Sequence, residues 1–156
     1  MSHSSSMVMD FDAALDRFKD ISQEKGLRLT HQRLEILREL VGAKDHPSAE
    51  VVFGRVRRRL PTISLDTVYR TLSTFDDLGL VMRVPVTGDQ GRFDADTSPH
   101  HHFVCSRCKS IYDFLWTEFD ELELPANSQS LGRPADRRVV VRGVCQACLD
   151  GHGADC

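Results

Sequence analysis

Two Cys-x-x-Cys pairs in the last third of the chain constrain its fold more than any other feature. Cys105 and Cys108 form the first pair, Cys145 and Cys148 form the second, and 36 residues separate them. Each pair can place two thiolates on one ion, and two pairs make the tetrahedral four-sulfur site that suits Zn²⁺. Free or redox-active motifs are the alternative, but the thioredoxin type begins a helix in a βαβ unit, which neither pair does. We therefore predict a structural zinc site, and we interpret Cys156 as an uncoordinated thiol.

The composition limits the class of protein. The chain has 156 residues, 40% hydrophobic and 28% charged, enough for one domain of about 150 residues or two small ones. Collagen, coiled coil and wholesale disorder are excluded, and no apolar run reaches the roughly 18–20 residues that cross a bilayer. The opening MSHSSSMVMD has no secretory pattern, so we expect a cytoplasmic protein without disulfides or a membrane partner. The net charge of −3 still permits a local basic face for nucleic acid.

The N-terminal half shows the apolar spacing of helices. Residues 11–22 predict the first helix. Thr30, Ser48 and Ser64 stand where N-cap residues belong, each ahead of a further apolar stripe. Gly79 is the expected end of the fourth helix.

After the fourth helix the apolar period changes to that of strands. Residues 80–86 and 92–94 predict two strands around the turn residues 87–91. Several helices followed by a two-stranded wing predict a winged helix-turn-helix. A small helical bundle with an incidental hairpin is the alternative.

A polar connector, residues 94–99, follows the wing and is interpreted as a hinge. Residues 117–131 can hold a short helix, which Pro125 would interrupt. Three strands are predicted around it, at residues 102–105, 110–116 and 137–144. Such a small, β-rich and core-poor unit needs a metal or a partner.

The segment PHHHFVCSRCKSIYDF predicts a second metal site. If the first Cys-x-x-Cys pair brackets a hairpin turn, the numbers of opposing residues sum to 213. His100 then lies opposite Asp113, and His102 lies opposite Ile111. Because side chains alternate along a strand, His100, His102 and Asp113 share one face. Two imidazoles and a carboxylate favour Fe²⁺ or Mn²⁺ over structural zinc; a His-rich surface turn is the alternative.

Three segments together resemble one known family: HHHFVCSRC with the later CQAC, SLDTVYRTLSTFDDLGLV, and RLTHQRLEIL. Across residues 11–150 they are similar to ferric-uptake-type (Fur) regulators. The resemblance implies an α+β protein with an N-terminal winged helix-turn-helix. It also implies a small C-terminal α/β dimerisation domain with a zinc-stapled antiparallel sheet. We accordingly expect four parts: a tail at 1–10, the winged helix at 11–93, a hinge at 94–99 and the metal-binding dimerisation domain at 100–156.

The resemblance implies two metal sites. The structural zinc ligands would be the cysteines at 105, 108, 145 and 148. The regulatory site of the family lies between the domains, and its peroxide-sensing branch (PerR) uses three histidines and two aspartates for Fe²⁺ or Mn²⁺. All five positions carry the expected residue type here: His46, Asp94, His100, His102 and Asp113. A third site of many iron sensors would need metal ligands at Pro99, His101 and Arg137, so we expect it to be missing.

The resemblance implies a homodimeric repressor of operator DNA and not an enzyme. An ion bound from both sides of the hinge would promote DNA binding, and iron-catalysed oxidation of His46 and His100 would reverse it. Asp113 resembles the peroxide sensors, whereas Arg70 resembles the iron sensors. An iron-responsive repressor with reversible Fe²⁺ binding is therefore the alternative. The zinc-sensing branch is disfavoured because residues 1–104 contain no cysteine.

Helix 64–78 is the predicted recognition helix. Its apolar stripe leaves one face outward: Asp66, Thr67, Arg70 and Thr71, with Tyr69 at the margin. Arg70 suits a guanine edge, and Tyr69 suits a thymine methyl or a phosphate. Arg28 resembles the family's minor-groove position, and Thr67 completes the predicted DNA contacts. Four arginines cluster near the third helix: Arg55, Arg57, Arg58 and Arg59. Two interpretations are open, electrostatic attraction of DNA phosphates or a simply solvated helix end.

Two further classes of protein remain alternatives. Two histidines and a carboxylate are also the facial triad of non-haem iron enzymes, although five candidate ligands leave few positions for a substrate. A zinc-stapled interaction module is the other alternative, and it would show no metal-dependent, sequence-specific DNA binding.

Overall fold

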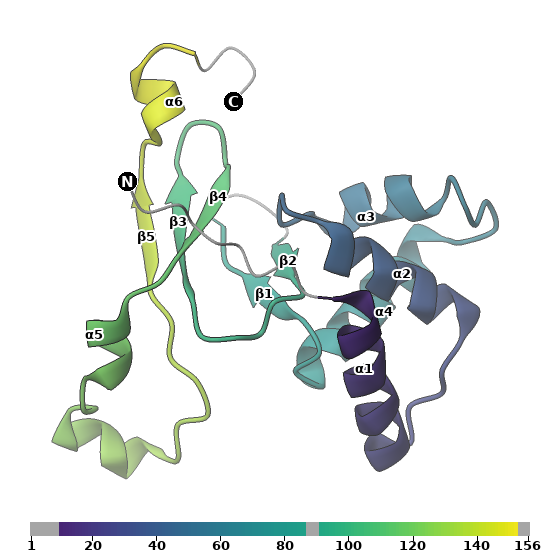
Figure 1. Ribbon diagram of the computed structural model, residues 1–156, viewed down its shortest axis with the longest axis horizontal. Helices are drawn as coiled ribbons and strands as arrows, with labels where there is room; N and C mark the ends of the chain where they lie inside the picture. The colour runs from purple at the N-terminus through teal and green to yellow at the C-terminus, as the bar shows by residue number, and fades with distance from the viewer. Residues whose placement is uncertain (1–9, 87–90, 153–156) are drawn as a thin grey trace. The chain divides into compact units, whose positions relative to one another are not determined.

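The computed structural model describes residues 10–86 and 91–152 (Figure 1). The chain divides into two compact units, and the division falls between Thr97 and Ser98. Our expectations for the tail before Asp10, for most of the wing turn (residues 87–90) and for Cys156 fall outside the described residues.

Four helices build most of the N-terminal unit. They are α1 (Phe11–Lys25), α2 (His31–Gly42), α3 (Ala49–Val56) and α4 (Leu65–Asp77). The predicted caps are confirmed, because the side-chain oxygens of Thr30, Ser48 and Ser64 each accept a backbone N–H three residues on. Gly79 has a φ of 68°, the left-handed conformation that stops a helix. The core between the helices includes the fully buried Phe18, Ile36, Leu72 and Phe75.

A short antiparallel hairpin completes this unit as a winged helix. Strand β1 (Met82–Val84) pairs with β2 (Arg92–Asp94), with Val84 opposite Arg92. Both strands lie within the predicted ranges, but β1 is shorter than residues 80–86. Phe93 of β2 is 2% exposed and joins the helical core, so the wing is fastened to the helices by apolar packing.

The C-terminal unit is a three-stranded sheet with small helices. The elements are β3 (His101–Cys105), β4 (Ile111–Phe114), α5 (Thr117–Glu121), the 3₁₀ helix η1 (Ala126–Leu131), β5 (Val140–Gly143) and α6 (Gln146–Leu149). Strand order is β4-β3-β5. The α+β class is confirmed, but the sheet is mixed: β3 pairs antiparallel with β4 and parallel with β5. Because β4 reverses the chain, the connection that holds α5 and η1 starts and finishes at the same end of the sheet, and β5 runs parallel to β3 on its other side.

The predicted register of the β3–β4 hairpin is wrong by two residues. His102, not His100, lies opposite Asp113, and Val104 lies opposite Ile111, so opposing numbers sum to 215. The turn is longer than expected, because the Cys105 N–H donates to the Ser110 carbonyl at 2.9 Å and residues 106–109 form the loop. A shift of two residues preserves the alternation of faces, so the predicted grouping of side chains survives.

The sheet of the C-terminal unit has two chemically different ends. Figure 1 shows α6 beyond one end of the sheet and α5 beyond the other. The described cysteines lie at the α6 end, whereas β3 begins with histidines at the opposite end. Among the described residues, no helix is long and apolar enough to span a membrane.

Candidate metal centres and DNA-binding surface

The four predicted zinc ligands come together at the α6 end of the sheet. Cys105 ends β3, Cys108 lies in the loop after it, and Cys145 and Cys148 begin and end the first turn of α6. The Sγ atoms of Cys105 and Cys148 are 3.8 Å apart, and those of Cys108 and Cys145 are 3.7 Å apart. Zn–S bonds of about 2.3 Å in a tetrahedron place sulfurs about 3.8 Å apart. The thiols therefore fit one Zn²⁺.

The protein environment favours the thiolate that a metal requires. The backbone N–H of Cys145 points at Cys105 Sγ from 3.3 Å and lowers the pKa of Cys105 to about 6. Burial acts to raise the pKa of Cys108, but hydrogen bonds with the hydroxyl and backbone of Ser110 outweigh it and leave that pKa below its usual value. Thiolates that already accept hydrogen bonds are oriented metal ligands.

Three donor atoms of the other predicted site converge within the C-terminal unit. The Nε2 atoms of His100 and His102 are 3.0 Å apart. Asp113 Oδ1 lies 3.4 Å from His102 Nε2 and 3.8 Å from His100 Nε2. Both histidines are almost wholly buried. Ligands on bonds of about 2.1 Å at roughly 90–110° are about 3.0–3.4 Å apart. The distances from His102 Nε2 to the other two atoms match this spacing for a nitrogen–oxygen metal site, whereas the 3.8 Å between Asp113 Oδ1 and His100 Nε2 is wider.

His101 faces the other side of the sheet and has a structural role. Its Nδ1 accepts the Val139 backbone N–H at 3.1 Å, and its Nε2 lies 3.3 Å from Asp120 Oδ1. The ring is fully buried among three aromatic side chains, those of Phe114, Trp116 and Phe119. The run of three histidines is thus divided between the two faces by strand alternation.

The remaining two predicted ligands lie together in the N-terminal unit. His46 Nε2 is 3.2 Å from Asp94 Oδ2, and the side chains are only 6% and 10% exposed. His46 stands in the loop before α3, and Asp94 ends β2. A buried imidazole beside a buried carboxylate provides one nitrogen and one oxygen donor at metal-ligand spacing.

Arg92 and Arg55, whose roles the sequence did not predict, hold the loop that carries His46. Arg92 of β2 donates to the carbonyl oxygens of both Asp45, at 2.5 Å, and His46. Arg55 of α3 binds the Asp45 carboxylate through both terminal nitrogens, which holds the pKa of Asp45 below its usual value. His46 has a φ of 48°, which side chains other than glycine adopt rarely. These contacts offset the cost of that backbone conformation.

Of the DNA-contact residues predicted on helix α4, Arg70 is exposed, and Thr67 and Tyr69 are half-buried. Arg70 is 80% exposed and forms an ion pair with Asp66 at 3.0 Å. Thr67 Oγ1 lies 2.8 Å from the capping Ser64 hydroxyl. The Tyr69 hydroxyl donates to Glu50 of α3. Arg28, ahead of α2, is exposed.

Our placement of Thr71 on the outer face of this helix is wrong, since its side chain is 5% exposed. It lies three residues after Val68 and next to Leu72, so it falls within the arc of α4 that packs on the core.

The four arginines near the end of α3 are not equivalent. Arg59 binds Glu35 at 2.8 Å and Glu39 at 3.0 Å, so it ties the end of α3 to α2. Arg55 binds Asp45, and the Arg57 guanidinium lies over the Phe53 ring. Because Arg55, Arg57 and Arg59 already have partners within the unit, these contacts disfavour the interpretation that the cluster attracts DNA phosphates. A charge run in the sequence does not reveal them.

Comparison with known proteins agrees with this geometry. The sequence profile of the Ferric uptake regulator family matches residues 24–130. The peroxide-responsive repressor PerR of Staphylococcus aureus is 33% identical over 128 residues, which cover 82% of this chain and 86% of that protein.

Two solved structures show the same fold. The ferric uptake regulator Fur of Helicobacter pylori, described as having three functional metal binding sites, superposes with a TM-score of 0.73. The match covers 91% of this chain and 95% of that chain, and at 19% identity it bears on the fold alone. The manganese-containing regulator of Pseudomonas aeruginosa has a TM-score of 0.65 at 27% identity, over 82% of this chain and 97% of its own. By profile and by similarity to its relatives, this chain belongs to the ferric uptake regulator family.

Proposed function

We propose that this protein is a homodimeric transcriptional repressor whose binding to operator DNA depends on a divalent ion. One observation carries the proposal: nitrogen and oxygen donors at metal-ligand spacing occur in both units, His46 with Asp94 in one and His100, His102 and Asp113 in the other. An ion that took ligands from both groups would stabilise one arrangement of the units. The ion would shift the equilibrium between arrangements of the units only by the difference in its affinity for them.

The two donor sets suit different ions. Four thiolates favour Zn²⁺, which would join β5 and α6 to the hairpin of β3 and β4 and supply the stability that a small sheet lacks. Imidazoles and carboxylates without a thiolate favour Fe²⁺ or Mn²⁺. Asp94 and Asp113 together carry the two negative charges that neutralise such an ion. The zinc is therefore proposed as structural and the second ion as regulatory.

The similarity to a peroxide-responsive repressor supports peroxide as the signal. Fe²⁺ held by these side chains would supply the electron that reduces H₂O₂. The resemblance to the peroxide-sensing branch points to His46 and His100 as the oxidation targets; their imidazoles, like that of His102, are buried beside a carboxylate of the proposed site. An oxidised imidazole is a weaker ligand, so the ion and then the DNA would be released. Mn²⁺ would support DNA binding without this chemistry.

Helix α4 is proposed to read the operator in the major groove. Arg70 is its most exposed cation, and its exposed ion pair with Asp66 contributes at most about 1 kcal/mol, so a guanine can replace it. Thr67 and Tyr69 lie beside it, and Arg28 would contact the minor groove. A protein with this role acts on DNA in the cytoplasm and is not an enzyme.

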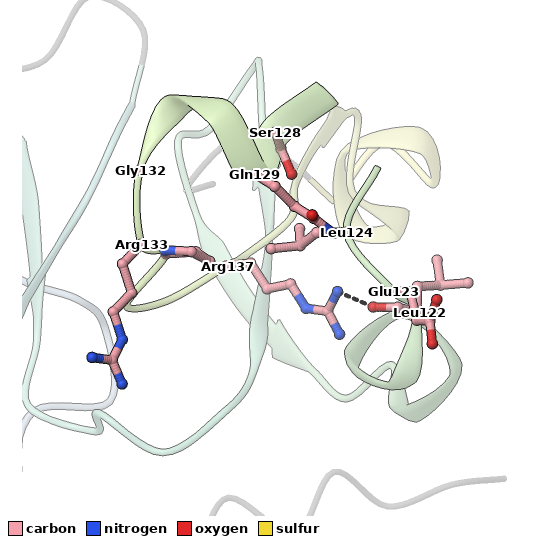
Figure 2. A pocket seen from close by; sticks show the side chains of 9 residues that line it. Leu122, Glu123, Leu124, Ser128, Gln129, Gly132, Arg133 and Arg137 are labelled. Carbon is pink, nitrogen blue, oxygen red and sulfur yellow. Dashed lines mark hydrogen bonds between the residues drawn. The ribbon is translucent and has the colours of Figure 1, made fainter. Parts of the chain in front are cut away.

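The C-terminal unit is proposed to form the homodimer. Among the described residues, ten large apolar side chains are exposed, and eight of them belong to this unit. A pocket of about 740 Å³ lies beside Leu122 and Leu124. Figure 2 shows its lining side chains, among which Arg137 donates to the Leu122 carbonyl. Apolar surface concentrated in this way is typical of an interface.

The test is metal-dependent DNA binding by the full chain. A duplex enriched from a random-sequence library by the Mn²⁺-loaded protein serves as the probe, and fluorescence anisotropy measures its affinity. We expect binding with Mn²⁺ or Fe²⁺ and its loss when a chelator removes only the second ion. Sequence-specific binding that is the same with and without that ion would contradict the proposal.

Treatment with H₂O₂ distinguishes a peroxide-sensing repressor from an iron-responsive one. With Fe²⁺, H₂O₂ should abolish DNA binding and add oxygen to peptides that contain His46 or His100, as mass spectrometry can detect. With Mn²⁺, the same treatment should leave both unchanged. Iron-dependent binding that survives peroxide without any added oxygen would indicate the iron-responsive repressor instead.

A further inference from the structure

Arg138 of the C-terminal unit binds the segment that carries His100. Its Nη1 donates to the Ser98 carbonyl at 3.0 Å and to the His100 carbonyl at 3.2 Å. The same nitrogen lies 3.4 Å from His100 Nδ1. Arg138 Nε donates to Asp136 Oδ2 at 2.8 Å, and only 15% of the arginine side chain is exposed. The guanidinium is therefore buried against this segment, with its charge balanced by Asp136.

The extent of the strand pairing shows where a side chain takes over from the backbone. The parallel ladder of β3 and β5 is regular from His102, whose N–H donates to the Val139 carbonyl at 3.1 Å. The paired residues of β3 and β5 begin at His102, so this ladder does not include Ser98 or His100. Arg138 supplies donors in place of the missing backbone bonds and binds the carbonyls on both sides of the proline.

The orientation of the His100 ring depends on the same carbonyl. His100 Nδ1 lies 2.8 Å from the Ser98 oxygen. Because a carbonyl oxygen only accepts, Nδ1 carries the proton and Nε2 keeps its lone pair. That Nε2 is the atom 3.0 Å from His102 Nε2 and 3.8 Å from Asp113 Oδ1. Arg138 and His100 Nδ1 thus share one acceptor, and the position of that acceptor determines the direction of the metal-binding atom.

We propose that Arg138 is a positioning residue for the regulatory metal site. By binding the Ser98 and His100 carbonyls, it holds His100 in the Nδ1–H tautomer with Nε2 directed at the ion, and it does not ligate the ion itself. The inference rests on the proposed role of His100 as a ligand. Groups that orient a metal ligand in this way typically change metal affinity by about 10–100-fold.

The test compares Mn²⁺ affinity among variants of the full, zinc-loaded chain by isothermal titration calorimetry. Arg138→Met should weaken Mn²⁺ binding by about 10–100-fold. Arg138→Lys keeps a buried donor for the carbonyls but lacks the planar fork, so its affinity should fall between those of Met and the parent. Arg142→Met is the matched control, since Arg142 is an exposed arginine of β5, and it should bind Mn²⁺ like the parent.

A second measurement reports position directly. Two-bond ¹⁵N–¹H spectra of the zinc-loaded protein without Mn²⁺ should show His100 as the Nδ1–H tautomer in the parent and in Arg142→Met, and as a mixture in Arg138→Met. Zinc content, measured by release to a chromogenic chelator, should be the same in all of them. A merely structural role would lower zinc retention without a selective change in the His100 spectrum.

The outcomes separate this inference from the proposed function. If His102→Ala leaves Mn²⁺ affinity unchanged, the proposed site is wrong and the role of Arg138 falls with it. If His102→Ala abolishes binding but Arg138→Met binds like Arg142→Met, only the role of Arg138 is overturned. If Arg138→Met does not fold, Arg138→Lys decides: weaker Mn²⁺ binding with full zinc supports the inference, and parental affinity overturns it.

Discussion

At the scale of single residues, the candidate metal ligands are held by side chains that bind the backbone. Arg92 donates to the carbonyls of Asp45 and His46, and Arg138 donates to those on either side of Pro99. In both cases a guanidinium binds more than one carbonyl, which a lysine or an amide cannot do with the same geometry. The ligands are therefore oriented before an ion arrives, which lowers the entropy that binding must overcome.

Arg92 offers a prediction for the N-terminal half of the site. Arg92→Met should weaken Mn²⁺ binding by about tenfold or more, because the left-handed conformation of His46 loses its support. Calorimetric titration measures the effect, with Arg58→Met, another arginine of the same unit with an exposed side chain, as the control. Equal Mn²⁺ affinity in the two variants would show that the His46 loop needs no such support.

The lowered pKa of Cys105 predicts how zinc retention depends on pH. The folded protein holds this pKa at about 6, below the usual 9.0, so folding favours the thiolate. Its contribution to folding stability should be full above about pH 9, decline as pH falls, and be absent below about 6. Zinc retention by this ligand should persist down to about pH 6 and fall below it, because protons then compete with the ion for the thiolate. Competition with a chromogenic chelator across this range measures zinc retention. Urea-unfolded protein should release zinc at a higher pH than folded protein, and coinciding release curves would contradict the assignment.

At the scale of elements, helix α4 combines core packing with an exposed face, the proposed reading face. Val68, Leu72 and Phe75 are fully buried, whereas Asp66 and Arg70 are exposed one turn apart. The Tyr69–Glu50 hydrogen bond links α4 to α3 and holds the pKa of Glu50 below its usual value. The reading face is therefore a fixed surface on the helical core.

Substitution of Arg70 tests that surface. Arg70→Met should cost about 1–3 kcal/mol of specific DNA binding and relax the choice of base at one position. Anisotropy with the selected duplex and with its single-base variants measures both effects. Arg57→Met, just after α3, should weaken binding to every duplex equally or not at all. Unaltered discrimination in Arg70→Met would remove Arg70 from the base contacts.

Helices and their ends were predictable because their signals are local. Capping hydroxyls at Thr30, Ser48 and Ser64 and the glycine at Gly79 specify boundaries through neighbours a few residues away. The β3–β4 register was not predictable, because it depends on a four-residue loop that places Cys108 off the strand. The parallel pairing of β5 depends on contacts between segments far apart in sequence.

The candidate ligands were predictable by type, but the residues that orient them were not. Cysteine spacing and strand alternation predicted which side chains gather in the C-terminal unit. Arg92 and Arg138 carry no motif, and each acts across 38 or more residues. Arg55 and Arg59 looked like part of a basic cluster, yet they bind Asp45, Glu35 and Glu39 within the fold.

At the scale of the whole molecule, the proposal requires the two units to share one regulatory ion. Zinc would stabilise the C-terminal unit at all times, whereas the second ion would come and go with iron, manganese or peroxide. The two donor sets differ in chemistry, so each can take its own ion without competing for the other. The response to the signal then depends on the link between the units and not on the stability of either one.

A double-mutant cycle on Mn²⁺ affinity tests that claim most directly. His46→Ala and His102→Ala each remove a ligand from one unit, and calorimetry measures Mn²⁺ binding in the parent, both single variants and the double variant. A shared ion predicts that either substitution removes most of the affinity and that the losses are not additive, with a coupling of about 0.5–3 kcal/mol. Additive losses, or a single variant that binds Mn²⁺ like the parent, would show that the two units do not hold one ion.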